Sequence, residues 1–218
     1  MRKTTMSGFA MAAAALLAAG SASAQVCAGF PTTDGQGTIG ALANFPTGFN
    51  EYGAEGSYNF TGPLAVNAGY IYSDTNDNHT NTFRGGVAFD VATAPGNFRS
   101  TVSICPNVRA DYASRDGTFH VTRWQVPVGL GVGTSTPLGG PGTNLTLHII
   151  PALYWTHVRA ESDDFPEFGG TQTDTNFGVR AGFELNFDRF YLGAISEWVD
   201  PFDSQSEAVV GVRAGVKF

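Results

Sequence analysis

Charged side chains recur at alternate positions along segments that are otherwise rich in apolar residues. Residues i and i+2 of a β-strand point to the same face, so this spacing gathers the charges on one face of a sheet. Six of these residues are basic and five are acidic, which allows ion pairs across neighbouring strands. The predicted charge cluster consists of Glu55, Arg84, Asp90, Arg109, Asp111, Arg123, Arg180, Glu184, Glu197, Arg213 and Lys217.

The histidines and the sequence motifs offer little catalytic chemistry. The four histidines are His79, His120, His148 and His157, and we identify no Ser–His or Asp–His arrangement of the kind that hydrolases need. His148 and His157 are nine positions apart, so they face opposite sides of one strand. No GxSxG, P-loop, HExxH or CxxC motif occurs, and no acidic run has EF-hand spacing. We therefore predict no catalytic residues, no metal site and no cofactor.

The composition excludes several classes of protein. Of 218 residues, 14% are charged, against roughly 25% in an average soluble domain, and 28 are glycine. The many aromatic residues argue against a disordered chain. The formal charge of −7 argues against a nucleic-acid partner. No apolar run reaches the roughly 20 residues that a membrane-spanning helix needs.

The first 24 residues have the organisation of a secretory signal peptide. Arg2 and Lys3 form a positive region, residues 9–19 are apolar, and Ala22-Ser23-Ala24 provides a small-x-small cleavage site. We predict a signal peptide at 1–24, a periplasmic N-terminal segment at 25–37 and one domain at 38–218.

Beyond residue 25 the apolar residues follow a period of two rather than 3.6, which indicates strands throughout. Turn signals such as Thr61-Gly62-Pro63 and Asp188-Arg189 separate the strands. Two sets of turns alternate: one is mostly short, and the other includes the longest connections and is rich in Asp and Glu. Ten strands are predicted, with eight as the alternative count, at about 38–45, 50–60, 64–73, 81–92, 99–113, 118–135, 144–160, 174–187, 190–199 and 207–218.

The two faces of these strands indicate which solvent each one meets. One face is nearly free of charge, while the other carries Gly, Ser, Asn and the predicted charge cluster. A soluble barrel or sandwich would have a charged exterior and an apolar interior. Lipid outside and a polar interior fit the pattern better, and a sheet in a membrane must close on itself to pair its backbone groups. The predicted fold class is therefore all-β: a closed antiparallel up-and-down transmembrane β-barrel.

Aromatic residues lie near both ends of the predicted strands, as the two belts at membrane interfaces require. Beside the short turns these residues are Phe60, Phe187, Phe190 and Phe218, and near the long connections they are Tyr52, Tyr72, Tyr112, Trp124, Trp155, Phe177 and Trp198.

Together, the signal peptide, the alternating strands, the turn asymmetry and the final GVRAGVKF resemble a small bacterial outer-membrane β-barrel of the porin-like and opacity-type superfamily. The resemblance covers residues 38–218 and implies a location in the outer membrane, among its lipids. It also implies that the terminal Phe218 is the signal read by the outer-membrane assembly machinery. An even strand count places both chain ends and the short turns in the periplasm, and the acidic connections outside.

The two cysteines of the chain are predicted to meet in an oxidising compartment. Cys27 follows the cleavage site, and Cys105 lies early in a strand, on its polar face and near the periplasmic end. We predict a Cys27–Cys105 disulfide that ties the N-terminal segment to the barrel. Two free or intermolecular thiols are the alternative.

The interior charges allow two functions to be proposed from the sequence. They form either an ion-paired plug that stabilises the wall or the lining of a narrow pore for passive diffusion. A surface adhesion or interaction protein is the alternative, acting through acidic loops that contact lipopolysaccharide or a cell-surface ligand. A barrel-embedded hydrolase is less favoured, although His157, Arg159 and Glu161 share a face near the outer rim.

Overall fold

The computed structural model describes residues 36–47, 49–60, 63–75, 78–96, 100–116, 120–139, 142–161, 169–200 and 208–218. The predicted signal peptide, residues 1–24, lies outside the described residues, and so does the segment 25–35. Among the described residues, no helix is long and apolar enough to cross a membrane.

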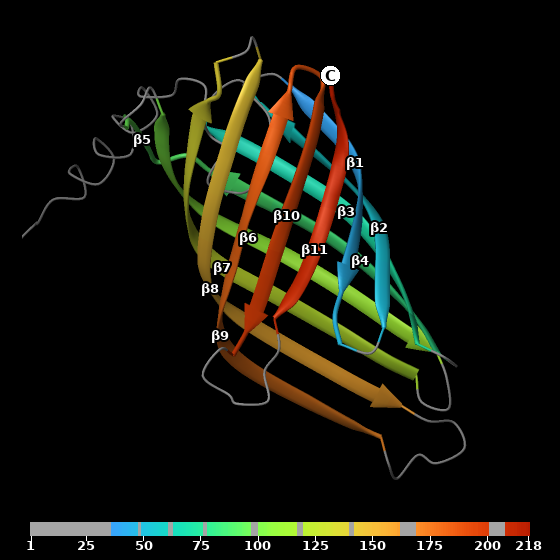
Figure 1. Ribbon diagram of the computed structural model, residues 1–218. Helices are drawn as coiled ribbons and strands as arrows, with labels where there is room; N and C mark the ends of the chain where they lie inside the picture. Colours follow the sequence, from blue (N-terminus) through green and yellow to red (C-terminus); the bar gives the residue numbers. More distant parts are fainter. Residues whose placement is uncertain are drawn as a thin grey trace, which may run out of the picture.

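Eleven strands make up the described part of the chain, and Figure 1 labels them in chain order. They are β1 (Gly37–Phe45), β2 (Asn50–Asn59), β3 (Leu64–Thr75), β4 (Asn78–Phe89), β5 (Ala92–Pro95), β6 (Thr101–Asp116), β7 (His120–Pro137), β8 (Thr143–Glu161), β9 (Gly170–Phe187), β10 (Phe190–Val199) and β11 (Val209–Lys217).

Ten of these strands form a closed wall. Each pairs with its neighbours in antiparallel register, the first strand β1 pairs with the last strand β11, and β4 pairs with β6. The predicted ten-strand barrel is therefore confirmed, and the alternative count of eight is wrong. Closure leaves no unpaired sheet edge around the ring, which is the condition for a sheet that faces lipid.

The additional strand β5 continues β4 along the same neighbour. Ala88 of β4 lies opposite Asn107 of β6, and Ala92 of β5 lies opposite Ile104. From one pair to the next, the chain advances four residues from Ala88 to Ala92 but only three along β6, from Asn107 to Ile104. The additional residue before β5 is that of a β-bulge. The alternation alone predicts one unbroken strand over 81–92, because a single inserted residue hardly disturbs the pattern.

Both ends of the barrel are defined by their connections. At the turn end, β2 is followed by β3, β7 by β8 and β9 by β10, and there β1 begins and β11 ends; at the loop end, β8 is followed by β9 and β10 by β11. Figure 1 shows the C-terminus at the turn end, and the β8–β9 hairpin extends furthest at the loop end.

Several strands continue further toward the loop end than the sequence predicts. β3 and β4 pair up to Thr75 and Asn78, β6 reaches Asp116, and β9 begins at Gly170. The predicted strands 64–73, 81–92, 99–113 and 174–187 are therefore too short at the loop end. These strand ends are polar on both sides, so they carry no apolar alternation to mark them as strands.

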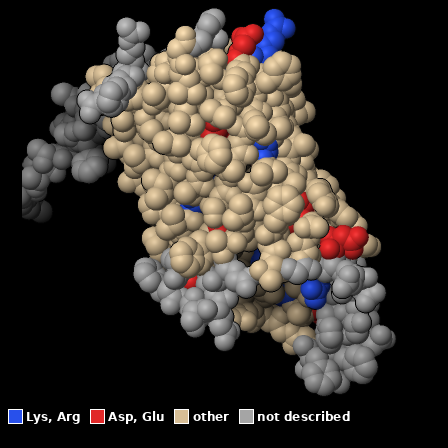
Figure 2. Space-filling model, viewed as in Figure 1, with Lys and Arg blue, Asp and Glu red and all other residues tan. Residues whose placement is uncertain are grey.

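The wall has an apolar exterior and a polar interior. Outward side chains such as Phe83, Leu153 and Val128 are more than half exposed, whereas the inward Glu184 and Asn59 are fully buried. In Figure 2 the middle of the visible wall is mostly free of Lys, Arg, Asp and Glu, whose atoms show there only as small areas between other side chains, while larger charged groups protrude toward the two ends. This is the inside-out arrangement expected of a membrane barrel.

Aromatic side chains occupy the outer surface near both ends of the wall. Near the loop end, Tyr52 lies opposite Tyr72, and Tyr112 lies opposite Trp124 with ring centroids 4.9 Å apart. Near the turn end, Phe187 lies opposite Phe190, and Phe218 pairs through its backbone with Gly37. The predicted partition of aromatic residues between the two ends therefore matches the strand registers.

Candidate functional site

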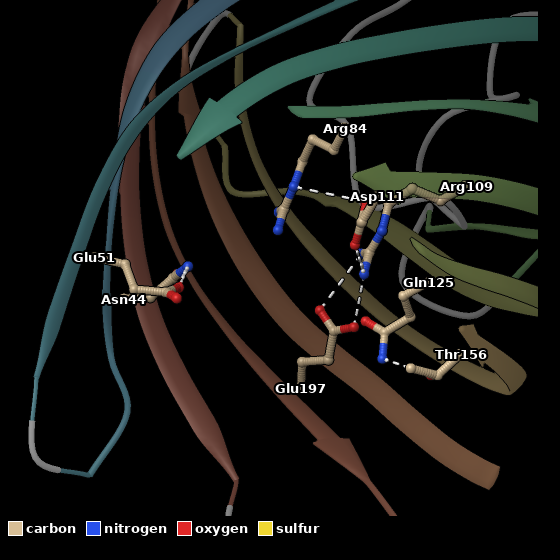
Figure 3. A network of polar contacts seen from close by, with 8 residues as sticks. All are labelled: Asn44, Glu51, Arg84, Arg109, Asp111, Gln125, Thr156 and Glu197. Atoms are coloured by element: carbon tan, nitrogen blue, oxygen red, sulfur yellow. Dashed lines mark hydrogen bonds and ion pairs between the residues drawn. The ribbon is translucent and has the colours of Figure 1, made fainter. Parts of the chain in front are cut away.

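A charged pair crosses the lumen of the barrel. Arg109 of β6 donates from Nη2 to Oε1 of Glu197 in β10, at 2.7 Å (Figure 3). Three strands, β7, β8 and β9, separate the two on the shorter way around the wall. The contact is therefore made across the interior rather than along the sheet, and we call it the cross-lumen bridge.

Further polar groups hold this bridge in place. The carboxylate of Asp111 lies 2.8 Å from Nη2 of Arg109 and 4.0 Å from Nε of Arg84, which faces it on the neighbouring strand (Figure 3). Arg180 lies directly opposite Glu197 in the register of β9 with β10. Since Arg109 and Asp111 are both buried, the pair is shielded from the water and salt that weaken exposed ion pairs.

A second ion-paired group lies closer to the turn end. The guanidinium of buried Arg213 in β11 contacts Glu184 of β9 and lies 3.5 Å from Glu55 of β2. One strand separates Arg213 from each partner: β10 on one side and β1 on the other. Glu184 lies beside Gly193 on β10, and a Cβ at that position would come within 2.7 Å of its Cγ. The glycine therefore makes room for a charged side chain against the wall.

Large side chains fill the lumen beside the cross-lumen bridge and toward the turn end. Tyr154, Tyr191, Ile150 and His148 are all nearly fully buried on the inward face. They lie over glycines: a Cβ at Gly178 would come within 2.6 Å of the Tyr154 ring, and one at Gly182 would come within 2.7 Å of the His148 ring. We call this part of the lumen, from the cross-lumen bridge to the turn end, the filled half.

On the loop-end side of the bridge the lumen is hollow. A cavity of about 740 Å³, which we call the vestibule, has Arg84, Arg109, Asp111 and Glu197 at its floor, and Arg115 lies near its outer edge. Two smaller cavities on the other side of the bridge measure only about 30 and 20 Å³, and both are lined by Arg109 and Arg180. Of these three cavities, the one in the loop-end half is therefore by far the largest.

The structure brings eight of the eleven predicted cluster residues together in these two groups. Of the other three, Arg123 is exposed in the vestibule, and Asp90 accepts hydrogen bonds from Ala92 N at 3.1 Å and Thr93 Oγ1 at 2.7 Å, at the bulge before β5. Lys217 lies at the last position of β11, at the turn end. The members of the two groups are Arg84, Arg109, Asp111, Arg180, Glu197, Glu55, Glu184 and Arg213.

The histidines of β8 lie on opposite faces of the strand, as predicted. His148 is buried in the lumen, while His157 stacks on Trp155 on the outer surface, with ring centroids 5.8 Å apart. Arg159 forms an ion pair with Glu161 on that same outer face. Within the described residues, no group of three or more His, Cys, Asp or Glu side chains is arranged to hold a metal ion.

The two remaining site predictions concern Cys105 and Phe218. Cys105 is fully buried on the inward face of β6, but Cys27 lies outside the described residues, so the disulfide stays a prediction. Phe218 follows β11 directly and is 73% exposed at the turn end.

Sequence reasoning missed Arg115 as a lumen residue, and it placed Gln125 on the polar face without including it in the predicted charge cluster. Both line the vestibule, and Gln125 donates from Nε2 to Thr156 Oγ1 at 3.4 Å. The even spacing from Arg109 through Asp111 and Ala113 to Arg115 is the signal that identifies Arg115, once the strand is known to continue to Asp116.

No protein-family model matches the sequence, and no curated protein matches it either. Solved structures do match. The outer membrane protease OmpT from Escherichia coli matches with a TM-score of 0.52 at 8% identity, over 84% of this chain and 95% of that chain.

Two further structures match with lower TM-scores. The translocator domain of the autotransporter NalP from Neisseria meningitidis matches with a TM-score of 0.46 at 12% identity, over 84% of this chain and 88% of that chain. The N-terminal β-barrel domain of Pseudomonas aeruginosa OprF matches with a TM-score of 0.43 at 14% identity, over 85% and 98%. Identities this low bear on the fold alone. With its closed wall, apolar exterior and polar interior, the chain has the fold of a transmembrane β-barrel, the fold it shares with the outer membrane protease OmpT.

Proposed function

We propose that this protein is a structural, non-enzymatic barrel of the outer membrane whose lumen is closed to diffusing solutes. The observation that carries the proposal is the cross-lumen bridge between Arg109 and Glu197, with the filled half behind it. A narrow pore would need a continuous water path from the vestibule to the turn end. The two cavities described beyond the bridge, of about 30 and 20 Å³, each have room for only one or two water molecules.

Physical chemistry supports a stable closure. Removing one partner of a buried ion pair costs about 3–5 kcal/mol, because the other charge is left without compensation in a poorly hydrated site. The buried charges of the filled half therefore hold one another in place, and thermal motion opens such a lumen rarely. In this interpretation the charges stabilise the wall rather than conduct ions.

Ion conductance in a planar lipid bilayer tests the closure. The purified protein is expected to show no discrete conductance steps, while the Arg109→Ala/Arg213→Ala double variant is expected to show them, because it removes a guanidinium from each ion-paired group. Arg189→Ala is the matched control, since this exposed arginine lies in a tight turn at the turn end. Heat-modifiable migration on a gel verifies that each protein is folded before it is measured.

Discrete steps from the folded wild-type barrel would overturn the closed-lumen proposal and favour the narrow pore. This outcome is decided by the wild-type protein alone, so it does not depend on the double variant folding.

The chain ends support two proposals about assembly. Phe218 lies exposed at the turn end, where a periplasmic assembly machinery and the membrane interface both have access to it. Cys105 is buried toward that end, where β1 begins at Gly37, which supports a bond to Cys27. Slower assembly of a Phe218→Ser variant tests the first proposal. Peptide mapping without reductant tests the second, and two alkylated thiols would contradict it.

A surface interaction is the second candidate function, favoured by the β8–β9 hairpin. Residues 170–175 of β9 are exposed on both faces, and the hairpin extends beyond the other strands at the loop end (Figure 1). Such a segment stands clear of the lipid and is accessible to a cell-surface ligand or to lipopolysaccharide. Shortening the hairpin and measuring adhesion separates the candidates: lost adhesion from a folded barrel favours the interaction, and unchanged adhesion argues against it.

A further inference from the structure

We propose that the vestibule is a binding site for a small solute carrying carboxylate or phosphate groups, held by Arg115 and Arg123. The proposal goes beyond the closed barrel, because it concerns the hollow half of the lumen rather than the filled half. Its volume of about 740 Å³ lies within the roughly 300–1,000 Å³ typical of small-molecule sites.

The charges of the vestibule do not cancel locally. Four arginines line it, Arg84, Arg109, Arg115 and Arg123, against three described carboxylates, Glu51, Asp111 and Glu197. Each carboxylate is already engaged in the wall. Asp111 and Glu197 contact Arg109, and Glu51 accepts hydrogen bonds from Asn44 Nδ2 at 2.9 Å and Ser73 Oγ at 3.1 Å.

Arg115 and Arg123 stand apart from these contacts. Among the described residues, neither guanidinium lies within 4.0 Å of a carboxylate oxygen, and both side chains are exposed. An exposed arginine in a cavity keeps its donors available, and its planar fork matches a carboxylate or phosphate. The positive charge is therefore free for a ligand at this point of an otherwise acidic chain, whose formal charge is −7.

The strand register places the two arginines on one wall. Arg115 of β6 pairs with Val121 of β7, and Arg123 pairs with Ala113, so the arginines are diagonal neighbours on the same inward face. Diagonal positions on paired strands lie roughly 7–8 Å apart, close enough for two guanidiniums to contact one anionic group. Ala113 lies between them and is too short to occupy the space.

The rest of the lining completes a pocket for a compact molecule. Gln125 adds a polar group deeper on the same wall, and Thr82 adds one at the level of Ala113. Ile71 and Val199 contribute apolar surface. The floor is the cross-lumen bridge, which stops the solute from passing on. The site thus fits a small organic anion, with its charged group toward β6 and β7.

Isothermal titration calorimetry of the purified protein in detergent micelles tests the proposal, with citrate and pyrophosphate as probes. We expect saturable binding of at least one probe, weakened about tenfold or more by Arg115→Ala and by Arg123→Ala, since a hydrogen bond to a charged group is lost in each. Arg189→Ala, with its arginine at the opposite end, is expected to bind as tightly as the wild type. Sucrose and spermidine serve as neutral and cationic comparisons.

Binding is also expected to weaken as ionic strength rises, because the vestibule arginines are exposed to salt. Three outcomes would overturn the proposal. The Arg115→Ala/Arg123→Ala double variant could bind the probes as tightly as the wild type, sucrose could give the same heats as citrate, or neither anion could give a saturable heat. Conductance tests whether the filled half is closed, whereas calorimetry tests binding in the vestibule. If the wild-type protein conducts ions and also binds the anions, only the closed-lumen proposal is overturned. Gel migration confirms that each variant is folded.

Discussion

The two halves of the lumen are built from the same strands and the same alternation, yet one is filled and the other is hollow. In the filled half, large inward side chains such as Tyr154 and Tyr191 lie over glycines, and charges are paired. In the vestibule, the inward positions carry small or exposed side chains such as Ser73, Ala113 and Arg123. Alternation therefore decides only which face a residue occupies. Whether empty space remains in the lumen depends on the sizes of the side chains that face one another across it.

The same contrast applies to the charges. Arg213 has two carboxylates within reach and is almost fully buried, whereas Arg123 is exposed and has none among the described residues. Burial makes a charge depend on its partner, because water no longer solvates it. We therefore infer that the filled half contributes stability and that the vestibule is available for binding.

The largest expected effect lies in the filled half, at Arg213. Replacing Arg213 with Ala leaves Glu184, which is fully buried, without its guanidinium and opens a cavity. The free energy of unfolding is expected to fall by about 3–5 kcal/mol, the usual cost of breaking a buried ion pair. Urea-induced unfolding in lipid vesicles, followed by tryptophan fluorescence, measures it.

A second variant separates the charge from the packing. Arg213→Met with Glu184→Gln removes both charges and keeps most of the volume, so it is expected to recover a large part of the loss. A loss below about 1 kcal/mol for Arg213→Ala itself would show that the pair contributes little.

The next effect concerns a glycine that allows close packing in the filled half. A Cβ at Gly40 would contact the hydroxyl of Tyr191 and come within 2.7 Å of the backbone oxygen of Ala214. Since a backbone oxygen cannot move cheaply, Gly40→Ala is expected to cost about 1–3 kcal/mol, the typical cost of overpacking. The same unfolding measurement reports it.

Gly85→Ala is the matched control, because its added Cβ would meet nothing closer than the Asn67 oxygen at 3.8 Å. This variant is expected to be neutral or slightly stabilising, since alanine restricts the unfolded chain. Equal losses at Gly40 and Gly85 would mean that the close contact with Tyr191 is unimportant.

Much of the barrel could be predicted from the sequence, because period-two alternation is a local signal. It identifies the ten strands and the inward face of residues such as Arg109, Glu184 and Glu197, each from its own segment. The alternation does not predict the bulge before β5, because one inserted residue changes the pattern too little to be recognised.

The pairing of the charges could not be predicted. Arg109 and Glu197 are 88 positions apart and meet only because strand tilt and stagger bring β6 and β10 to the same height across the lumen. Asp90 has the inward spacing of the cluster, yet it lies near the turn end and bonds to its own bulge. Alternation specifies a face, and height along the barrel axis is set by the register of the whole ring.

The smallest expected effect is in the vestibule and completes the comparison. Arg123→Ala removes a guanidinium that is exposed and makes no ion pair among the described residues, so no buried charge is left behind. The free energy of unfolding is expected to change by no more than about 0.5 kcal/mol, as for ordinary surface substitutions. Urea unfolding under the conditions used for Arg213→Ala gives the direct contrast. A loss of about 2 kcal/mol or more would place Arg123 in the stabilising network with Arg109, and its guanidinium would then not be available to an anion.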